Sequence, residues 1–282
     1  MAPLTMKTPG IPGRAAVRVV LSASLLVRIA GAAAAQEARD PHAVQPERPT
    51  VATHAYTVAP GFLEIEAGVE YDRYADRSKG GVAPVVFKLG LAPRLQLDLD
   101  VSALRPPSGT AVGLGDLSVA LKWRLAEGAP VLGDFSVIPS LKLPTAPTAS
   151  GLGTGTTDVG LVLVSSRQLG SVEMDLNLGY THRSGPDGFA PRDATLWTAS
   201  FGGPVSGALG WTAELYGYPA TSGPAGAASI VALLGGPTLL ARPSLAFDAG
   251  VIIPVTGPQP LAVYIGCVYN VGRLWGARTP NR

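Results

Sequence analysis

His182 and Ser184 have the residue types and the spacing that nucleophilic catalysis can use. In a strand, residues two apart share a face, so the histidine could take the proton of the serine hydroxyl. Gly185 and Pro186 follow at once and turn the chain, and no asparagine on a neighbouring strand stands ready to orient the ring. A histidine beside Tyr180 at the end of a strand is the plainer interpretation of the same residues.

The other reactive residues do not have the spacing of a site. The three histidines, His42, His54 and His182, are not spaced as metal ligands are, so we expect no metal. The stretch GLGTGTTD at 151–158 lacks the Gly-Lys-Ser/Thr ending of a phosphate loop and precedes no predicted helix. Cys267 is the only cysteine, so it cannot form an internal disulfide. The sequence therefore predicts no cofactor and no catalytic residue.

A stronger pattern is the placement of acids at every second position. Residues 95–104 read LQLDLDVSAL, in which apolar residues alternate with Gln96, Asp98, Asp100 and Ser102. Successive side chains of a strand point to opposite faces, so one face is apolar and the other carries carboxylates. The same period recurs along the chain and puts twelve acids and four bases on polar faces. They are Glu64, Glu66, Glu70, Asp72, Lys88, Asp98, Asp100, Asp116, Lys122, Arg124, Lys142, Asp158, Glu173, Asp175, Glu214 and Asp248.

This alternation predicts about twelve strands, each of a length suited to a tilted membrane strand. They lie near 62–73, 82–91, 95–104, 115–125, 133–144, 157–167, 171–182, 194–203, 208–218, 227–239, 243–254 and 260–272. Longer connections follow the first strand and every second strand after it, and mostly short ones follow the others. Short turns at one end and longer loops at the other are typical of an outer-membrane barrel. The predicted fold is an all-β, antiparallel, up-and-down transmembrane barrel over residues 61–276.

The two faces of the strands decide between a membrane barrel and a soluble fold. In lipid, strands can span only as a closed barrel, with apolar residues outside and the acids facing a lumen. Aromatic residues near strand ends would then form two interfacial girdles. They are Tyr71, Trp123, Phe135, Tyr180, Trp197, Trp211 and Tyr269. A soluble β-sandwich or lipocalin-like barrel has the same alternation, but usually a more charged surface than a chain with 15% charged residues supplies.

Two predicted strands depart from the pattern. Pro139 interrupts FSVIPSLKLP and predicts a bulge, because proline removes a ladder hydrogen bond. The run IVALLGGPTLL around Gly235 has no polar alternation. A slip of one residue would exchange lumen for lipid at every side chain of a strand, so the register near these two residues stays open.

Both ends of the chain lie outside the predicted barrel. Residues 1–35 have a basic start, an apolar middle and a run of alanines, as a secretory signal does, so we expect export and cleavage after about Ala35. This segment carries four basic residues and no acid, so cleavage takes the formal net charge from +2 to −2 and argues against a nucleic-acid partner. Residues 36–60 are an extended periplasmic lead-in that could plug the lumen, and residues 277–282 form a tail.

The chain from about Arg48 onward resembles a known family. The segments RPTVATHAYTVAPGFLEIEAGVEY, GLGDLSVALKWRL and IPSLKLPTAPTASGLGTGTTDVGLVLVSSRQLGSVEMDLNLGYTH carry the resemblance. They are similar to the outer-membrane proteins named after the meta-cleavage pathway of phenol degradation, which are often labelled transporters. The resemblance implies a barrel in the outer membrane of a Gram-negative bacterium that passes aromatic or other hydrophobic small molecules. Unlike common barrels, the chain continues past Tyr269 with RLWGARTPNR instead of ending on an aromatic residue.

The function expected from these features is passive passage of a small permeant through an acidic lumen. Unpaired carboxylates would favour cations over anions, whereas a lumen filled by ion pairs and water would not select. One alternative is a lipid hydrolase, since His182-Arg183-Ser184 is similar to the His-x-Ser arrangement of outer-membrane phospholipase. Another is a closed structural barrel. The expected partners are outer-membrane lipids and the permeant, whose identity the pattern does not specify, and the oligomeric state stays open.

Overall fold

The computed structural model describes residues 40–107, 112–185, 192–223 and 226–276. The predicted signal at 1–35 and the predicted tail at 277–282 lie outside the described residues. No helix in the described part of the chain is long and apolar enough to cross a membrane.

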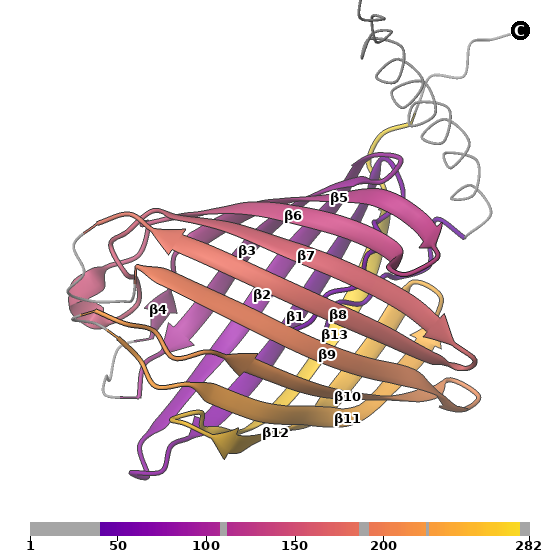
Figure 1. Ribbon diagram of the computed structural model, residues 1–282. Helices are drawn as coiled ribbons and strands as arrows, with labels where there is room; N and C mark the ends of the chain where they lie inside the picture. Colours follow the sequence, from indigo (N-terminus) through magenta and orange to yellow (C-terminus); the bar gives the residue numbers. More distant parts are fainter. Residues whose placement is uncertain (1–39, 108–111, 186–191, 224–225, 277–282) are drawn as a thin grey trace, which may run out of the picture. The chain divides into compact units, whose positions relative to one another are not determined.

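Within the described residues, twelve long strands and one short strand form a single antiparallel sheet (Figure 1). The strands are β1 (Phe62–Arg73), β2 (Lys79–Ala92), β3 (Leu95–Arg105), β4 (Gly113–Leu114), β5 (Leu117–Ala129), β6 (Gly133–Leu143), β7 (Asp158–Leu169), β8 (Val172–Arg183), β9 (Asp193–Ser206), β10 (Leu209–Tyr218), β11 (Ile230–Arg242), β12 (Leu245–Thr256) and β13 (Leu261–Arg273). The sheet is closed, because β1 pairs with both β13 and β2, and β2 pairs with β3. The predicted twelve-stranded barrel is confirmed.

Each long strand follows the two-residue period that the sequence predicts. In β13, Ala262, Tyr264, Gly266, Val268 and Asn270 are buried, whereas the residues between them are mostly exposed. The exposed set along the barrel is dominated by Leu, Val, Ile, Phe and Tyr, which is the apolar outer surface that a lipid environment requires. The inner face carries most of the charged residues of the strands, so polar side chains lie in the lumen.

The connections differ at the two ends of the barrel. Residues 93–94, 130–132, 170–171, 207–208 and 243–244 make the turns at one end. At the other end, the connections include residues 144–157, which contain the short helix η3 (Thr148–Ser150), and residues 219–229. Short turns face the periplasm and longer loops the outside in barrels of this type.

The register is regular around Pro139 of β6 and around Gly235 of β11, whose ladder with β12 shifts only near its two ends. Ala120 pairs with Ser140 and Trp123 with Val137 in one register, so the bulge predicted at Pro139 is wrong. The irregularities of this ladder lie instead between Arg124 and Ala129. Proline removes one N–H, and a ladder can lose one bond without shifting, because the neighbouring pairs still fix the register.

Strand β11 alternates in orientation although its residues are apolar on both faces. Ala232 and Leu234 are buried on the lumen side, and Leu233 and Leu239 are exposed. The lumen therefore has an apolar wall here, which explains why the sequence shows no polar alternation around Gly235.

Leu178, in the middle of β8 and 63% exposed, provides a test of the outward face. We expect Leu178→Arg to destabilise the barrel by about 2–4 kcal/mol, because an arginine near the bilayer midplane must be desolvated. The measurement is urea unfolding in lipid vesicles. Leu132→Arg, in the short turn between β5 and β6, is the control and should cost about 0–1 kcal/mol. Equal losses at both positions would contradict the orientation of β8.

Candidate functional site

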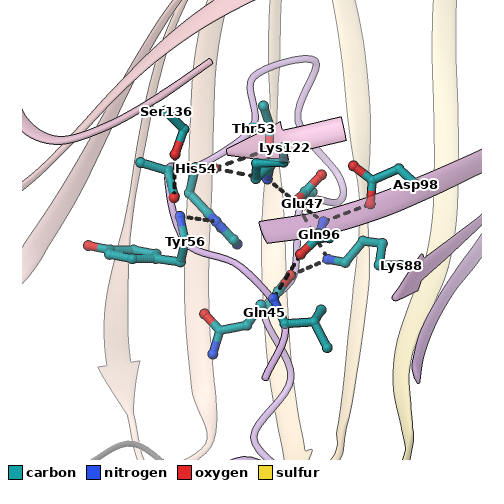
Figure 2. Close-up of polar contacts among 12 residues, drawn as sticks. Gln45, Glu47, Thr53, His54, Tyr56, Lys88, Gln96, Asp98, Lys122 and Ser136 are labelled. Carbon is teal, nitrogen blue, oxygen red and sulfur yellow. Dashed lines mark hydrogen bonds and ion pairs between the residues drawn. The ribbon is translucent and has the colours of Figure 1, made fainter. Parts of the chain in front are cut away.

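Residues 40–60, here called the inner segment, run inside the barrel without joining its sheet. Figure 2 shows this segment as a narrow tube surrounded by the strands, with the side chain of Glu47 among Lys88, Gln96 and Lys122. Ala55 and Val58 are almost completely buried. The sequence left open whether this stretch enters the lumen, and the contacts below place it there.

Side chains of the wall supply hydrogen-bond partners for the backbone of the inner segment. A backbone that does not join a ladder must find other partners, since buried N–H and C=O groups are costly to leave unpaired. Glu64 accepts from Gln45 N (2.8 Å), Glu66 from Glu47 N (2.8 Å), Glu214 from Val51 N (2.8 Å) and Ala52 N (2.7 Å), Asn177 from Thr53 N (2.8 Å), Ser166 from Ala55 N (2.8 Å) and Gln96 from Val58 N (2.7 Å). Three of the predicted lumen acids are therefore acceptors for this backbone.

Two fully buried lysines of the wall hold the inner segment electrostatically (Figure 2). Lys88 Nζ lies 2.7 Å from both Glu64 Oε1 and Glu66 Oε1 of β1 and 3.7 Å from Glu47 Oε1 of the inner segment. Lys122 Nζ forms an ion pair with Glu47 and donates to Thr53 Oγ1 (2.7 Å) and the His54 carbonyl (3.0 Å). Buried charges are tolerated only when they are paired in this way, and removing one partner typically costs about 3–5 kcal/mol.

The ionisation of Glu47 and His54 depends on these lysines. Burial opposes the charge on Glu47, but the ammonium groups of Lys122 and Lys88 outweigh it and hold the pKa of Glu47 well below its usual range. Burial, reinforced by Lys122, lowers the pKa of His54 from 6.5 to about 3. His54 Nδ1 accepts from the backbone N–H of Tyr56 at 3.2 Å, which requires an unprotonated Nδ1. His54 is therefore neutral at physiological pH.

A cavity of about 340 Å³ lies between the inner segment and the wall of β8–β13. Its charged lining residues are Arg48 from the inner segment and Glu173, Asp175 and Asp248 from the strands. Val44 packs with Ala246 and Val268 in an apolar cluster at the same cavity. The cavity thus combines an acidic and an apolar surface.

A second apolar surface lies on the lumen side of β10–β13. Val51 of the inner segment packs against a cluster of buried residues on these strands. They are Tyr216, Ala232, Leu234, Ile252, Ala262 and Tyr264. The wall facing this part of the inner segment is therefore largely hydrophobic.

Hydrogen bonds to Asp116 tie the loop between β6 and β7 to the barrel. Asp116 accepts from Ala146 N (3.0 Å) and Thr154 N (3.1 Å). Lys142 Nζ lies 3.2 Å from Asp116 and 3.0 Å from Asp158. These contacts fix the loop at the end of the barrel opposite the short turns.

The remaining predicted lumen residues lie at inward positions of the strands. Arg124 forms an ion pair with Glu127 at 2.7 Å near the short-turn end. No cation of the described residues forms an ion pair with Glu70, Asp72, Asp98, Asp100 or Asp175. Asp98 accepts instead from Gln96 (2.7 Å). The structure thus divides the predicted acids into those that hold the inner segment or a base and those available to the lumen.

The predicted girdle residues lie on the outward face. Tyr71, Trp123, Tyr180 and Tyr269 are exposed, and Phe135, Trp197 and Trp211 are partly exposed. Trp197 lies over Gly217 of the neighbouring strand, where a Cβ would overlap the indole ring. Whether these rings meet a membrane interface remains a prediction.

The candidate catalytic pair is not assembled in the described residues. Ser184 Oγ donates to the Thr157 carbonyl (2.7 Å) and accepts from Thr157 N (3.1 Å), so its hydrogen-bonding capacity is directed to the loop. His182 Nδ1 lies 2.8 Å from Asp193 of β9. Sequence reasoning looked for an asparagine at this place and missed this aspartate. No group of three or more His, Cys, Asp or Glu side chains suited to a metal ion occurs among the described residues.

His54 gives the inner segment a pH dependence that can be measured. When the inner segment is bound to the wall, the pKa of His54 is about 3; when the segment is released into water, the pKa returns to 6.5. Binding of the segment is therefore fully favourable above pH 6.5 and weakens as the pH falls toward 3. At pH 5 the balance should shift toward release by about thirtyfold. The current through a planar bilayer should therefore rise as the pH is lowered from 7 to 5.

The variant His54→Asn keeps an acceptor for Tyr56 N and removes the titration. Its current should rise less than that of wild type over this pH range, because residue 54 no longer takes up a proton. A rise of the same size in wild type and His54→Asn would assign the effect to other groups.

The comparisons with known proteins agree with this barrel. No curated protein sequence matches the chain. Among solved structures, an outer-membrane channel from Pseudomonas putida F1 is similar with a TM-score of 0.59 and 15% identity over 77% of this chain and 97% of that one. The KdgM porin, solved in complex with oligogalacturonate, has a TM-score of 0.49 and 11% identity over 72% of this chain and 98% of that one. At these identities the likeness shows the fold alone.

The family model described as "Putative MetA-pathway of phenol degradation" matches residues 47–260, which include most of the inner segment and all strands up to β12. The chain is a member of this family.

Proposed function

We propose that this barrel is an outer-membrane channel for passive passage of small molecules, with the inner segment as a built-in constriction. The observation that carries the proposal is the cavity of about 340 Å³ beside the inner segment, inside a closed barrel. A permeant would pass between this segment and the wall of β8–β13. The fold shared with the P. putida outer-membrane channel and the family membership support this role.

The lining of the cavity supports a preference for cations and for molecules with an apolar face. Both buried lysines of the wall form ion pairs with glutamates, while Glu173 and Asp175 line the cavity. Carboxylates at a narrow passage raise the local concentration of cations. The apolar cluster around Val44 offers contact for aromatic or other hydrophobic permeants.

We also place the protein in the outer membrane of a Gram-negative bacterium, after export through a cleaved signal peptide. The apolar outer face of the strands, the asymmetry of the loops and the basic-apolar start of the sequence support this location. Passage needs no cofactor.

Conductance in planar bilayers tests the channel and the constriction together. Lys122→Met leaves Glu47 without its nearest cation, so the inner segment should be seated less firmly and current steps should become larger than in wild type. At low salt, where screening is weak, potassium should be more permeant than chloride. Lys79→Met, an exposed lysine at the start of β2, is the matched control and should leave the steps unchanged.

The two parts of the proposal fail in different ways. Wild-type steps in a folded Lys122→Met barrel would show that the inner segment does not limit the current. Silence from both folded proteins would contradict the channel and favour a closed structural barrel.

Phospholipid hydrolysis tests the enzymatic alternative. Because Ser184 Oγ is bonded to Thr157, we expect no release of labelled fatty acid from phospholipid vesicles, either by wild type or by Ser184→Ala. Release that is abolished by Ser184→Ala would revive the hydrolase function.

A further inference from the structure

The guanidinium of Arg48 lies on a part of the wall that has no side chains beneath it. Gly68 of β1 and Gly266 of β13 are paired directly across the two strands that close the barrel. A Cβ on either glycine would overlap the guanidinium of Arg48. Only glycine at both positions leaves room for a flat group against the backbone.

Asp248, on the neighbouring strand, provides the acidic partner of this guanidinium. Asp248 of β12 is paired with Gly266 of β13, and its side chain is 4% exposed. Its two carboxylate oxygens face two nitrogens of Arg48: Oδ2 lies 3.4 Å from Nε, and Oδ1 lies 3.3 Å from Nη2. This fork-to-fork geometry suits a planar guanidinium and not a compact ammonium. We call Gly68, Gly266 and Asp248 the guanidinium seat.

The contacts in the seat are longer than those of a tight pair. Charge-assisted N–H···O bonds are usually about 2.7–2.9 Å long. Both bonds between Arg48 and Asp248 exceed this range. Lys122, by contrast, forms a closer ion pair with Glu47 of the inner segment. The ion pair of Arg48 with the wall is therefore looser than that of Glu47 with Lys122.

The seat opens onto the acidic cavity. Arg48 and Asp248 both line it, together with Glu173 and Asp175 of β8. With three carboxylates and one guanidinium, the charged lining has a net negative charge, because His54 is neutral at physiological pH. A small cation that enters the cavity would be drawn toward Asp248.

We propose that the guanidinium seat binds planar organic cations of the guanidinium or amidinium class, and that Arg48 occupies it as an internal competitor of such a permeant. An incoming cation of this class would pair with Asp248 and stack on the two glycines in place of Arg48. This inference rests on the proposed channel, since the cation reaches the seat through the lumen.

Binding of methylguanidinium to the refolded barrel in detergent micelles tests the seat without relying on current. The measured quantity is NMR line broadening of the free ligand at millimolar concentration. Arg48→Ala should bind it about tenfold more tightly than wild type, because the competing side chain is gone. Adding Asp248→Asn or Gly266→Ala to Arg48→Ala should abolish this gain, by removing the carboxylate or filling the seat. Heat-modifiable migration in gels checks that each variant is folded.

The cation used as a control is tetramethylammonium, which has the same charge but no planar donors. Its binding should gain much less from Arg48→Ala than that of methylguanidinium, because it gains only from the loss of one positive charge. Equal gains for both cations, or a gain that survives Asp248→Asn, would overturn the seat as a specific site.

Bilayer current separates this inference from the channel itself. In Arg48→Ala, methylguanidinium should reduce the potassium current at concentrations about tenfold lower than in wild type. Binding without any current from the folded variants would leave the seat standing and refute the channel. Current without selective binding would leave the channel standing and refute the seat.

Discussion

Backbone N–H groups inside a barrel, but outside its sheet, must be paired by side chains, and this requirement organises the whole lumen. The inner segment cannot pair with strands whose own backbone groups are already used in a closed ladder. The wall therefore offers carboxylates, amides and hydroxyls at inward positions. Glu214 illustrates the arrangement, because its two oxygens accept from two successive N–H groups of the segment. Polar residues that look like a pore lining in the sequence are here partners for a backbone.

The same requirement explains why charge in the lumen is unevenly distributed. On the side of β1, β2 and β5, acids and lysines neutralise one another around Glu47. On the side of β8–β13, acids line a cavity, and a separate part of the wall, on β10–β13, is apolar. The inner segment is thus held on both sides, by ion pairs on one side and by Asn177, Glu214 and apolar contacts on the other.

The period of the sequence was sufficient to predict the fold, because a two-residue alternation fixes which face of each strand meets lipid. Leu178 and Asn177 are one residue apart, and one is exposed while the other is buried in the lumen. The alternation could not predict which residue each inward side chain contacts. The pairing of Glu214 with Val51 joins residues far apart in the chain, and nothing in residues 40–60 is periodic. The aspartate beside His182 was missed for the same reason, since it belongs to the next strand. The bulge predicted at Pro139 was wrong because a strand can lose one N–H without a shift of register.

The position of the two glycines under Arg48 has a consequence for assembly. Gly68 belongs to the first strand of the barrel and Gly266 to the last, so the surface they share does not exist until the two ends of the sheet have joined. Until then, the guanidinium of Arg48 lacks one of its two glycines, even if all the other strands are already paired. Seating of this one side chain therefore requires the ring to be complete.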